Sequence, residues 1–142
     1  MAGETDIKTL NVVKETFIAA PADIVFETLL EPHGPMKEMN MKLEPWPGGR
    51  WFRDTGNNTG HLWGHVQVIK PPKVLELVGP TMMSYPVASH IQYKLTEQDG
   101  GTMLKFWHKA FGWIPDGLEA DVSKGWGEML GKIKEAAERK RK

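Results

Sequence analysis

The feature that most constrains this chain is an amphipathic segment near its C-terminus, residues 118–139. Apolar side chains recur there at helical spacing and fall on one face of a helix: Leu118, Val122, Trp126, Met129, Leu130, Ile133 and Ala137. A helix with so broad an apolar stripe is stable only against a large apolar surface. No other segment is helical enough to supply that surface. We therefore predict that the helix packs on a β-sheet.

The rest of the chain supplies the strands of that sheet. A first strand is predicted at residues 9–18, followed by a short helix that ends before Pro32 and a second short helix or turn at 33–40. Six further strands follow, separated by Gly- and Pro-rich turns: residues 41–45, 50–54, 61–69, 73–78, 87–96 and 102–111. Consecutive strands joined by tight turns indicate an antiparallel sheet, and helices at both ends indicate an α+β fold. Without a linker, residues 1–142 are expected to form one domain.

Composition excludes several classes of protein. The chain has 18 basic and 18 acidic side chains, whereas binding to nucleic acid or to an anionic membrane usually needs a basic surplus. It has no cysteine, which excludes disulfides, thiolate metal sites and cysteine nucleophiles. No signal peptide or membrane-spanning run is evident. We therefore expect a cytoplasmic protein without a cofactor.

Several motifs, in a fixed order, resemble one superfamily. Residues 17–26 read FIAAPADIVF, residues 47–51 read PGGRW, and residues 64–68 (GHVQV) are followed by PPKVL at 71–75. GTML at 101–104 with His108 and Gly112, and GWGEML at 125–130, complete the set. This order resembles the START-like, birch-pollen-allergen-like (SRPBCC) superfamily. Within it, the chain most resembles the branch named after the C-terminal domain of activators of the heat-shock protein 90 ATPase.

The resemblance implies a helix-grip fold, in which a curved antiparallel sheet wraps around the C-terminal helix and leaves a cavity. It also implies possible docking on a heat-shock chaperone. Many members carry a tryptophan pair after the first helix, where this chain has Met36, Met39 and Met41 instead. Methionine side chains are adaptable, so this part of the cavity wall is expected to be softer.

Catalytic signatures are weak in this sequence. His61 and His65 are four residues apart, but on a strand that spacing separates them by roughly 13 Å, too far for one metal ion. No serine lies in a Gly-x-Ser-x-Gly elbow. His108 is the best single candidate, because strand alternation places it inside with Leu104 and Phe106. It is either a hydrogen-bonded core residue or a polar contact in a cavity.

The predicted ligand-binding residues lie along the sheet and the last helix: Trp51, Tyr93, Phe106, His108, Trp113, Trp126 and Leu130. Met82, Met83 and Tyr85 form either a lid over the cavity or a segment folded onto the sheet edge. The glycines of the last helix, Gly125, Gly127 and Gly131, indicate either close backbone approach or room for a ligand. Trp63 and Trp107 have outward parity and predict an exposed apolar patch for a chaperone or a second copy.

Three functions are compatible with these features. The leading hypothesis is binding of a small apolar or aromatic molecule between sheet and C-terminal helix. The second is a chaperone-interacting module. The third is a cyclase- or hydratase-type enzyme that uses His108 as acid or base, although no second titratable group is placed to complement it.

Overall fold

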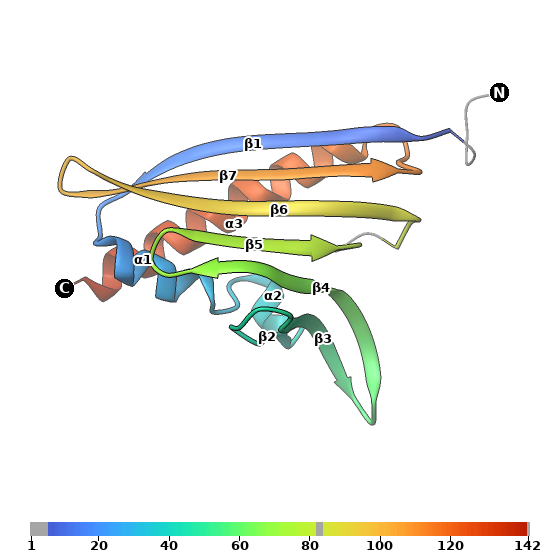
Figure 1. Cartoon of the computed structure of the whole chain (residues 1–142), viewed down its shortest axis with the longest axis horizontal. Helices are drawn as coiled ribbons and strands as arrows, with labels where there is room; N and C mark the ends of the chain where they lie inside the picture. Colours follow the sequence, from blue (N-terminus) through green and yellow to red (C-terminus); the bar gives the residue numbers. More distant parts are fainter. Residues whose placement is uncertain (1–5, 82–83, 142) are drawn as a thin grey trace.

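Seven strands and three helices make up the part of the chain that the computed structural model describes, residues 6–81 and 84–141. The helices are α1 (Ala22–Leu29), α2 (Pro35–Glu38) and α3 (Leu118–Lys140). The strands are β1 (Lys8–Ile18), β2 (Met41–Leu43), β3 (Arg50–Gly56), β4 (Thr59–Lys70), β5 (Val74–Gly79), β6 (Val87–Gln98) and β7 (Gly101–Gly112). They form one antiparallel sheet in the order β1-β7-β6-β5-β4-β3-β2 (Figure 1). The predicted α+β helix-grip fold is confirmed.

Helix α3 runs along one face of the sheet, behind β7 and β6 in the view of Figure 1. The apolar stripe that the sequence predicts is the buried face of this helix: Val122, Trp126, Met129, Leu130, Ile133 and Ala137 are all buried, and Leu118 is partly buried against them. The sheet contributes the opposite wall of the core, including Leu104, Phe106 and Ile91, each with no measurable exposure. Burial of this shared surface is the main term that holds helix and sheet together.

The three strands β1, β7 and β6 are long and regular. β6 and β7 pair without interruption from Val87 opposite Gly112 to Gln98 opposite Gly101. Their hairpin turns at Asp99 and Gly100, which both have positive φ as this tight turn requires. β1 pairs with β7 along all 11 of its residues. Alternation of inward and outward side chains is therefore undisturbed in this half of the sheet.

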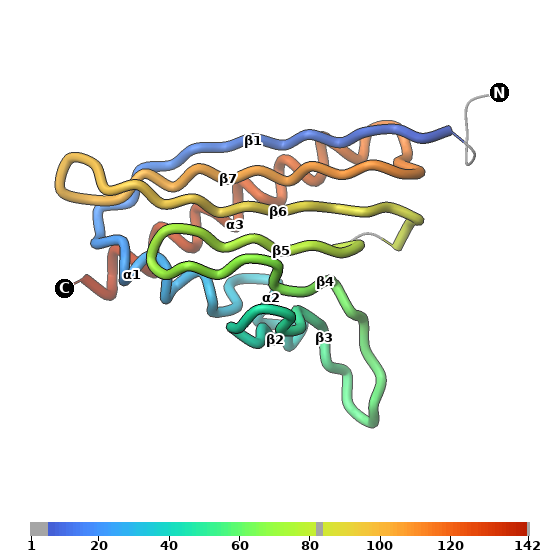
Figure 2. Tube along the Cα trace, viewed as in Figure 1, coloured from blue at the N-terminus to red at the C-terminus, as the bar shows by residue number. Residues whose placement is uncertain are grey.

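The β3–β4 hairpin is irregular and bends away from the remaining sheet (Figure 2). Trp51 pairs with Gly64 and Phe52 with Leu62, so Trp63 is an extra residue on β4. This bulge shifts the alternation of β4 by one position. Trp63 is therefore 6% exposed and packs edge-on against Trp51 with ring centroids 5.1 Å apart. The prediction that Trp63 faces outward is wrong, because it counted alternation from Val66 through the bulge.

The glycines of α3 are not sites of close backbone approach. A Cβ atom added to Gly125 or Gly131 would meet nothing within 4 Å, and one added to Gly127 would touch only the Lys14 side chain, at 3.6 Å. All three lie on the exposed side of the helix. The expectation of a crowded or hollow site beside them is wrong.

Polar side chains of α3 bind the free edge of β1. Glu119 accepts a hydrogen bond from the Asn11 backbone N–H (3.3 Å), and Glu138 accepts one from the N–H of Ala19 just past the strand (2.8 Å). Lys134 donates to the carbonyl of Phe17 at 2.7 Å. These contacts satisfy backbone groups that an edge strand otherwise exposes. Among the described residues, no helix has the length and hydropathy needed to cross a membrane.

Candidate functional site

His108 lies at the centre of a buried hydrogen-bonded chain. The Trp126 indole N–H donates to His108 Nδ1 at 2.9 Å, and His108 Nε2 lies 3.0 Å from Ser89 Oγ. Because an indole nitrogen can only donate, Nδ1 must be the acceptor and Nε2 must carry the proton. Beyond Ser89, the Thr81 hydroxyl lies 3.4 Å away.

This arrangement makes His108 a satisfied core residue. Burial lowers the pKa of His108 from 6.5 to about 4, so the ring is neutral near pH 7. Both ring nitrogens are already engaged, and the side chain has no measurable exposure. A general acid or base needs a nitrogen within reach of a substrate proton. The geometry therefore offers His108 for positioning Trp126, not for proton transfer.

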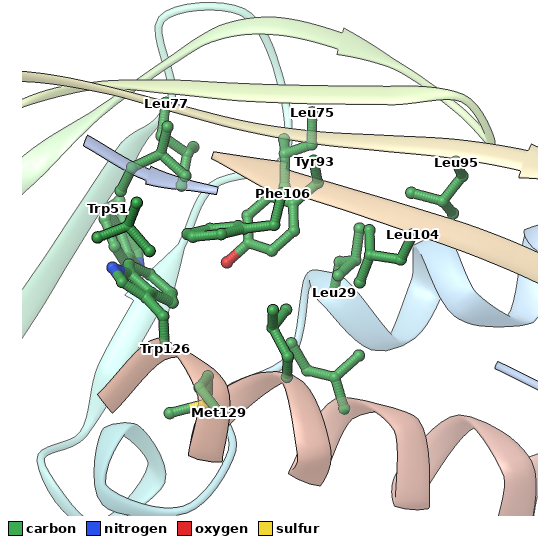
Figure 3. Packing of buried hydrophobic residues seen from close by; sticks show 14 of the residues in the cluster. Leu29, Trp51, Leu75, Leu77, Tyr93, Leu95, Leu104, Phe106, Trp126 and Met129 are labelled. Carbon is green, nitrogen blue, oxygen red and sulfur yellow. The ribbon is translucent and has the colours of Figure 1, made fainter. Parts of the chain in front are cut away.

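An inner cavity of about 40 Å³ lies between the sheet and the helices. Its wall is largely apolar and comes from five strands and helices, including Leu29, Met36, Met41, Trp51, Leu75, Leu77, Met129 and Ile133. Figure 3 shows six side chains of this wall: Leu29, Trp51, Leu75, Leu77, Tyr93 and Met129. The volume has room for a few water molecules, whereas pockets for drug-sized ligands measure roughly 300–1,000 Å³.

Tyr93 is the polar group at the inner end of this cavity. Its side chain is 6% exposed, and its ring packs edge-on against Phe106 with centroids 5.1 Å apart. The hydroxyl points from the sheet toward the helices (Figure 3). Burial raises the pKa of this hydroxyl, which is therefore neutral. Within residues 6–81 and 84–141, no group forms a hydrogen bond with it. A buried hydroxyl without a partner is costly in a filled core.

A larger, open groove of about 1070 Å³ follows β2, β3 and the start of β4. It shares part of its wall with the inner cavity: Leu30, Pro32, Met41, Lys42 and Leu43. A third hollow, of about 520 Å³, lies between the α1–α2 segment and the last turns of α3. This hollow shares Glu31, Pro32 and His33 with the cavity. The α1–α2 segment, residues 30–34, is thus the rim at which all three spaces meet.

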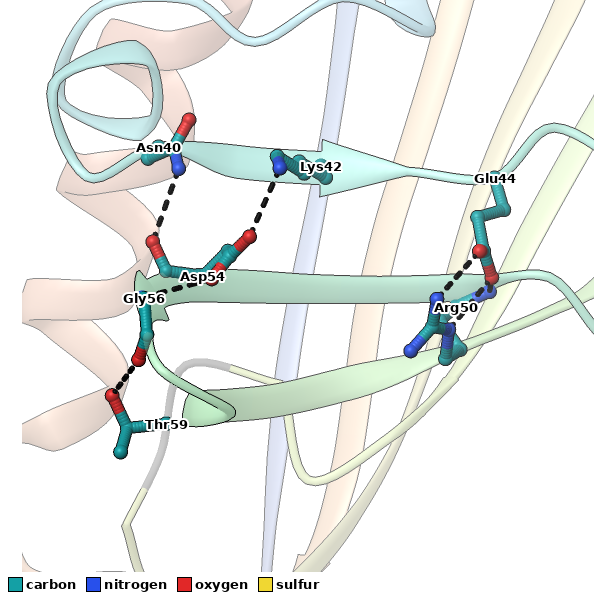
Figure 4. Close-up of polar contacts among 7 residues, drawn as sticks. All are labelled: Asn40, Lys42, Glu44, Arg50, Asp54, Gly56 and Thr59. Atoms are coloured by element: carbon teal, nitrogen blue, oxygen red, sulfur yellow. Dashed lines mark hydrogen bonds and ion pairs between the residues drawn. The ribbon is translucent and has the colours of Figure 1, made fainter.

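The charges along the open groove are paired with one another (Figure 4). Arg50 holds Glu44 through two guanidinium contacts of 2.9 and 2.8 Å, and Lys42 binds Asp54 at 3.0 Å. The hydrogen bond from Arg50 lowers the pKa of the Glu44 carboxyl to about 2. Hydrogen bonds from the Gly56 N–H and then from Lys42 lower the pKa of Asp54. Both acids are therefore ionised near neutral pH, and the groove wall carries little net charge.

Trp51 and Tyr93 are the two predicted ligand-binding residues that line the inner cavity. Phe106, Trp126 and Leu130 are buried in the packed core beside it, and the rings of Phe106 and Trp126 lie 4.6 Å apart. His108 belongs to the buried chain described above. The roles of these residues in binding stay a prediction.

The predicted lid residues do not lie over the inner cavity, as far as the structure describes them. The Tyr85 ring packs edge-on against Trp113, with centroids 5.2 Å apart, and both side chains are half-buried. Neither contributes to the cavity wall. Met82 and Met83 lie outside the described residues.

Trp107 lies on the outer face of the sheet, as predicted, but it is half-buried. Lys109 Nζ lies 4.5 Å above its ring, and the His90 ring packs edge-on at 5.8 Å. Its indole N–H is buried and has no hydrogen-bond partner among the described residues. The exposed apolar side chains of this face are Val13 (50% exposed) and Phe111 (60%), with Ile7 (73%) just before β1. The predicted two-tryptophan patch is therefore absent from the described surface.

Sequence reasoning missed the rim and much of the cavity wall. Pro32 was interpreted only as a helix stop, yet it lines all three spaces. Met129 and Ile133 were assigned to the core face of α3 without a role at the cavity. A signal was present, because the methionines at 36, 41 and 129 share one adaptable side-chain chemistry and meet at one site.

Comparison with known proteins places these features in a family context. Residues 19–138 match the family described as Activator of Hsp90 ATPase homolog 1-like protein. No curated protein matches the sequence.

Solved structures share the fold at low sequence identity. An uncharacterised protein from Rhizobium leguminosarum has a TM-score of 0.75 at 20% identity, covering 94% of this chain and 97% of its own. A protein from Mesorhizobium loti has a TM-score of 0.70 at 23% identity, covering 91% and 97%. The Aha1 dimer from Colwellia psychrerythraea has a TM-score of 0.64 at 18% identity, covering 91% and 96%.

Proposed function

Because this chain belongs to the Activator of Hsp90 ATPase homolog 1-like family, whose fold commonly binds ligands, we propose that it binds a small, mainly apolar or aromatic molecule. The ligand enters past the α1–α2 rim and extends between sheet and α3 to Tyr93. We further propose that residues 1–142 act as one domain in this role.

The observation that carries this proposal is the unpartnered hydroxyl of Tyr93. A core evolved only for packing would place phenylalanine there, because a buried hydroxyl without a hydrogen bond costs free energy. A ligand with a hydrogen-bonding group at its inner end would satisfy it. One or a few precisely placed polar groups in an apolar wall are the usual composition of a small-molecule site.

The cavity must widen to admit such a ligand. Three of its wall residues are methionines, and their unbranched side chains adopt new rotamers at low cost. The helix α2 has only four residues and buries none of them. Such a segment has few contacts to lose, so it can move outward while the sheet and α3 stay in place.

Binding of 2-naphthol and naphthalene tests the proposal directly. Both are titrated into the protein while binding is followed by native mass spectrometry and thermal unfolding, with decanol and decane as a second pair. We expect the hydroxylated member of a pair to bind more tightly, by about 1 kcal/mol or roughly fivefold. In Tyr93→Phe this preference should disappear while the fold is kept. Failure of all four compounds to bind would overturn the proposal.

A second candidate is docking on a chaperone of the Hsp90 class, which the family description names. The outer face of the sheet favours it, because exposed Val13 and Phe111 flank half-buried Trp107 with its unpartnered N–H. Titration of purified Hsp90 with the wild type and with Val13→Ser/Phe111→Ser tests this candidate. Equal binding by both proteins, or no binding by either, would remove it.

A further inference from the structure

The third hollow, between the α1–α2 segment and the end of α3, is rich in cations. It is lined by Lys37 of α2 and by Lys132, Arg139 and Lys140 of α3, against the two carboxylates Glu31 and Glu135. The α3 residues lie three to four positions apart, so they share one side of the helix. We call this space the cationic hollow.

Only one of these cations is neutralised by a neighbour. Lys140 binds both oxygens of Glu31, at 2.8 and 2.7 Å. In the described residues, Lys37, Lys132 and Arg139 take part in no ion pair, and neither does Glu135. Three unpaired cations thus surround one unpaired carboxylate. Such an excess attracts an anion, and it does so more strongly beside a low-dielectric wall.

The other opening of the cavity does not offer the same charge. Along the open groove, Arg50 and Lys42 are bound to Glu44 and Asp54, which leaves Arg53 as its one cation without an ion pair among the described residues. An anionic group is therefore attracted to the cationic hollow in preference to the groove.

Adjacent residues on two helices connect the cationic hollow with the inner cavity. On α2, Met36 lines the cavity and Lys37 lines the hollow; on α3, Ile133 lines the cavity and Lys132 lines the hollow. The Lys132 side chain also lies across Gly34, where an added Cβ would come within 3.0 Å of its Cδ. Apolar wall thus gives way to cationic wall within one residue on each helix.

We propose that the ligand of the inner cavity is an amphipathic anion. Its apolar body lies between Met36, Ile133 and Tyr93, and its carboxylate or phosphate lies in the cationic hollow against Lys37, Lys132 and Arg139. This inference rests on the proposed function and adds the chemical class of the ligand. A molecule with an acidic group at one end and a hydrogen-bonding group at the other matches the polar groups at both ends of this space.

Calorimetric titration with three matched ligands tests the inference: 6-hydroxy-2-naphthoate, its uncharged methyl ester, and 6-hydroxy-2-naphthyl phosphate. We expect at least one anion to bind tenfold or more tightly than the ester, and its affinity to fall as salt rises. The two anions distinguish a carboxylate ligand from a phosphate ligand. Binding is compared in the wild type, in Lys132→Ala/Arg139→Ala and in the matched groove control Arg53→Ala.

The double variant should lose about tenfold in affinity for the anion and keep its affinity for the ester, whereas Arg53→Ala should behave as wild type. Thermal unfolding of each variant confirms that it is folded. Equal binding of anions and ester would overturn the inference but leave the proposed function standing. Loss of anion binding in Arg53→Ala alone would also overturn it, by placing the acid in the groove. If no naphthyl ligand binds, the proposed function fails with it.

Discussion

The two ends of the sheet differ in how their interiors are filled. Where α3 crosses β1, β7 and β6, strand pairing is continuous and the core contains Phe106, Trp126 and His108 without measurable gaps. At the β2–β4 end, strands are bulged, β2 has only three residues, and all of the spaces around the α1–α2 rim are found. Stability therefore resides mainly at one end, and the capacity to admit a ligand resides at the other.

The largest expected effect is on the filled end. Trp126→Ala removes a fully buried indole and leaves His108 Nδ1 without its donor, so we expect a loss of about 3–5 kcal/mol in the free energy of unfolding. The matched control is Phe52→Ala at the other end, which should cost less than about 1 kcal/mol because Phe52 is only half-buried. Urea unfolding measures both. Equal costs would contradict the division between the ends.

A pH dependence of stability isolates the buried histidine. Because the folded-state pKa of His108 is lowered to about 4, the unfolded chain binds its proton first as pH falls below 6.5. Stability is thus fully present above pH 6.5 and falls toward pH 4, by about 2 kcal/mol at pH 5. Urea unfolding at pH 7 and pH 5 measures this loss.

His108→Gln serves as the comparison, since its amide oxygen can still accept the Trp126 N–H. We expect it to lack the decline between pH 7 and pH 5. The Glu44 contribution falls in a separate window, because its lowered pKa costs stability only as pH drops below 4.5 toward 2. A variant that keeps the full pH 7 to pH 5 decline would show that other groups cause it.

A stabilising change is expected on the exposed side of α3. Gly131→Ala adds a methyl group into open space in a helix interior, so it should raise the free energy of unfolding by about 1 kcal/mol. Because α3 serves both ends, the gain should appear without a change in ligand affinity. Thermal and urea unfolding measure the gain, and a destabilised variant would indicate a neighbour that the open space does not contain.

The smallest change in stability is expected at the soft end. Met36→Ala removes a half-buried side chain from the cavity wall, and alanine favours the helix, so the cost should stay below about 1 kcal/mol. Affinity for 2-naphthol should rise, since less side chain must be displaced. Calorimetry measures it, and weaker binding would indicate that Met36 contacts the ligand and does not block it.

The sequence was informative where local alternation continues into the fold. The buried face of α3 and the inward position of His108 followed from periodicity alone, because neither helix nor β7 is interrupted. Trp63 could not be placed correctly, since the bulge depends on the pairing of β4 with β3. The size of the cavity depends on how side chains from many strands and helices fill one space. The cationic hollow joins residues 31–37 with residues 132–140, which no local pattern connects.

The contacts that α3 makes with the free edge of β1 constrain the order in which the chain can be protected. β1 is made early, yet its partner β7 lies about ninety residues later, and the side chains that cover its outer edge come later still, from Glu119 to Glu138. A nascent chain therefore carries an uncovered strand through most of its synthesis, when pairing with another chain competes with folding. Removal of the last helix would leave that strand permanently open to such pairing, so aggregation is the expected fate of a truncated protein.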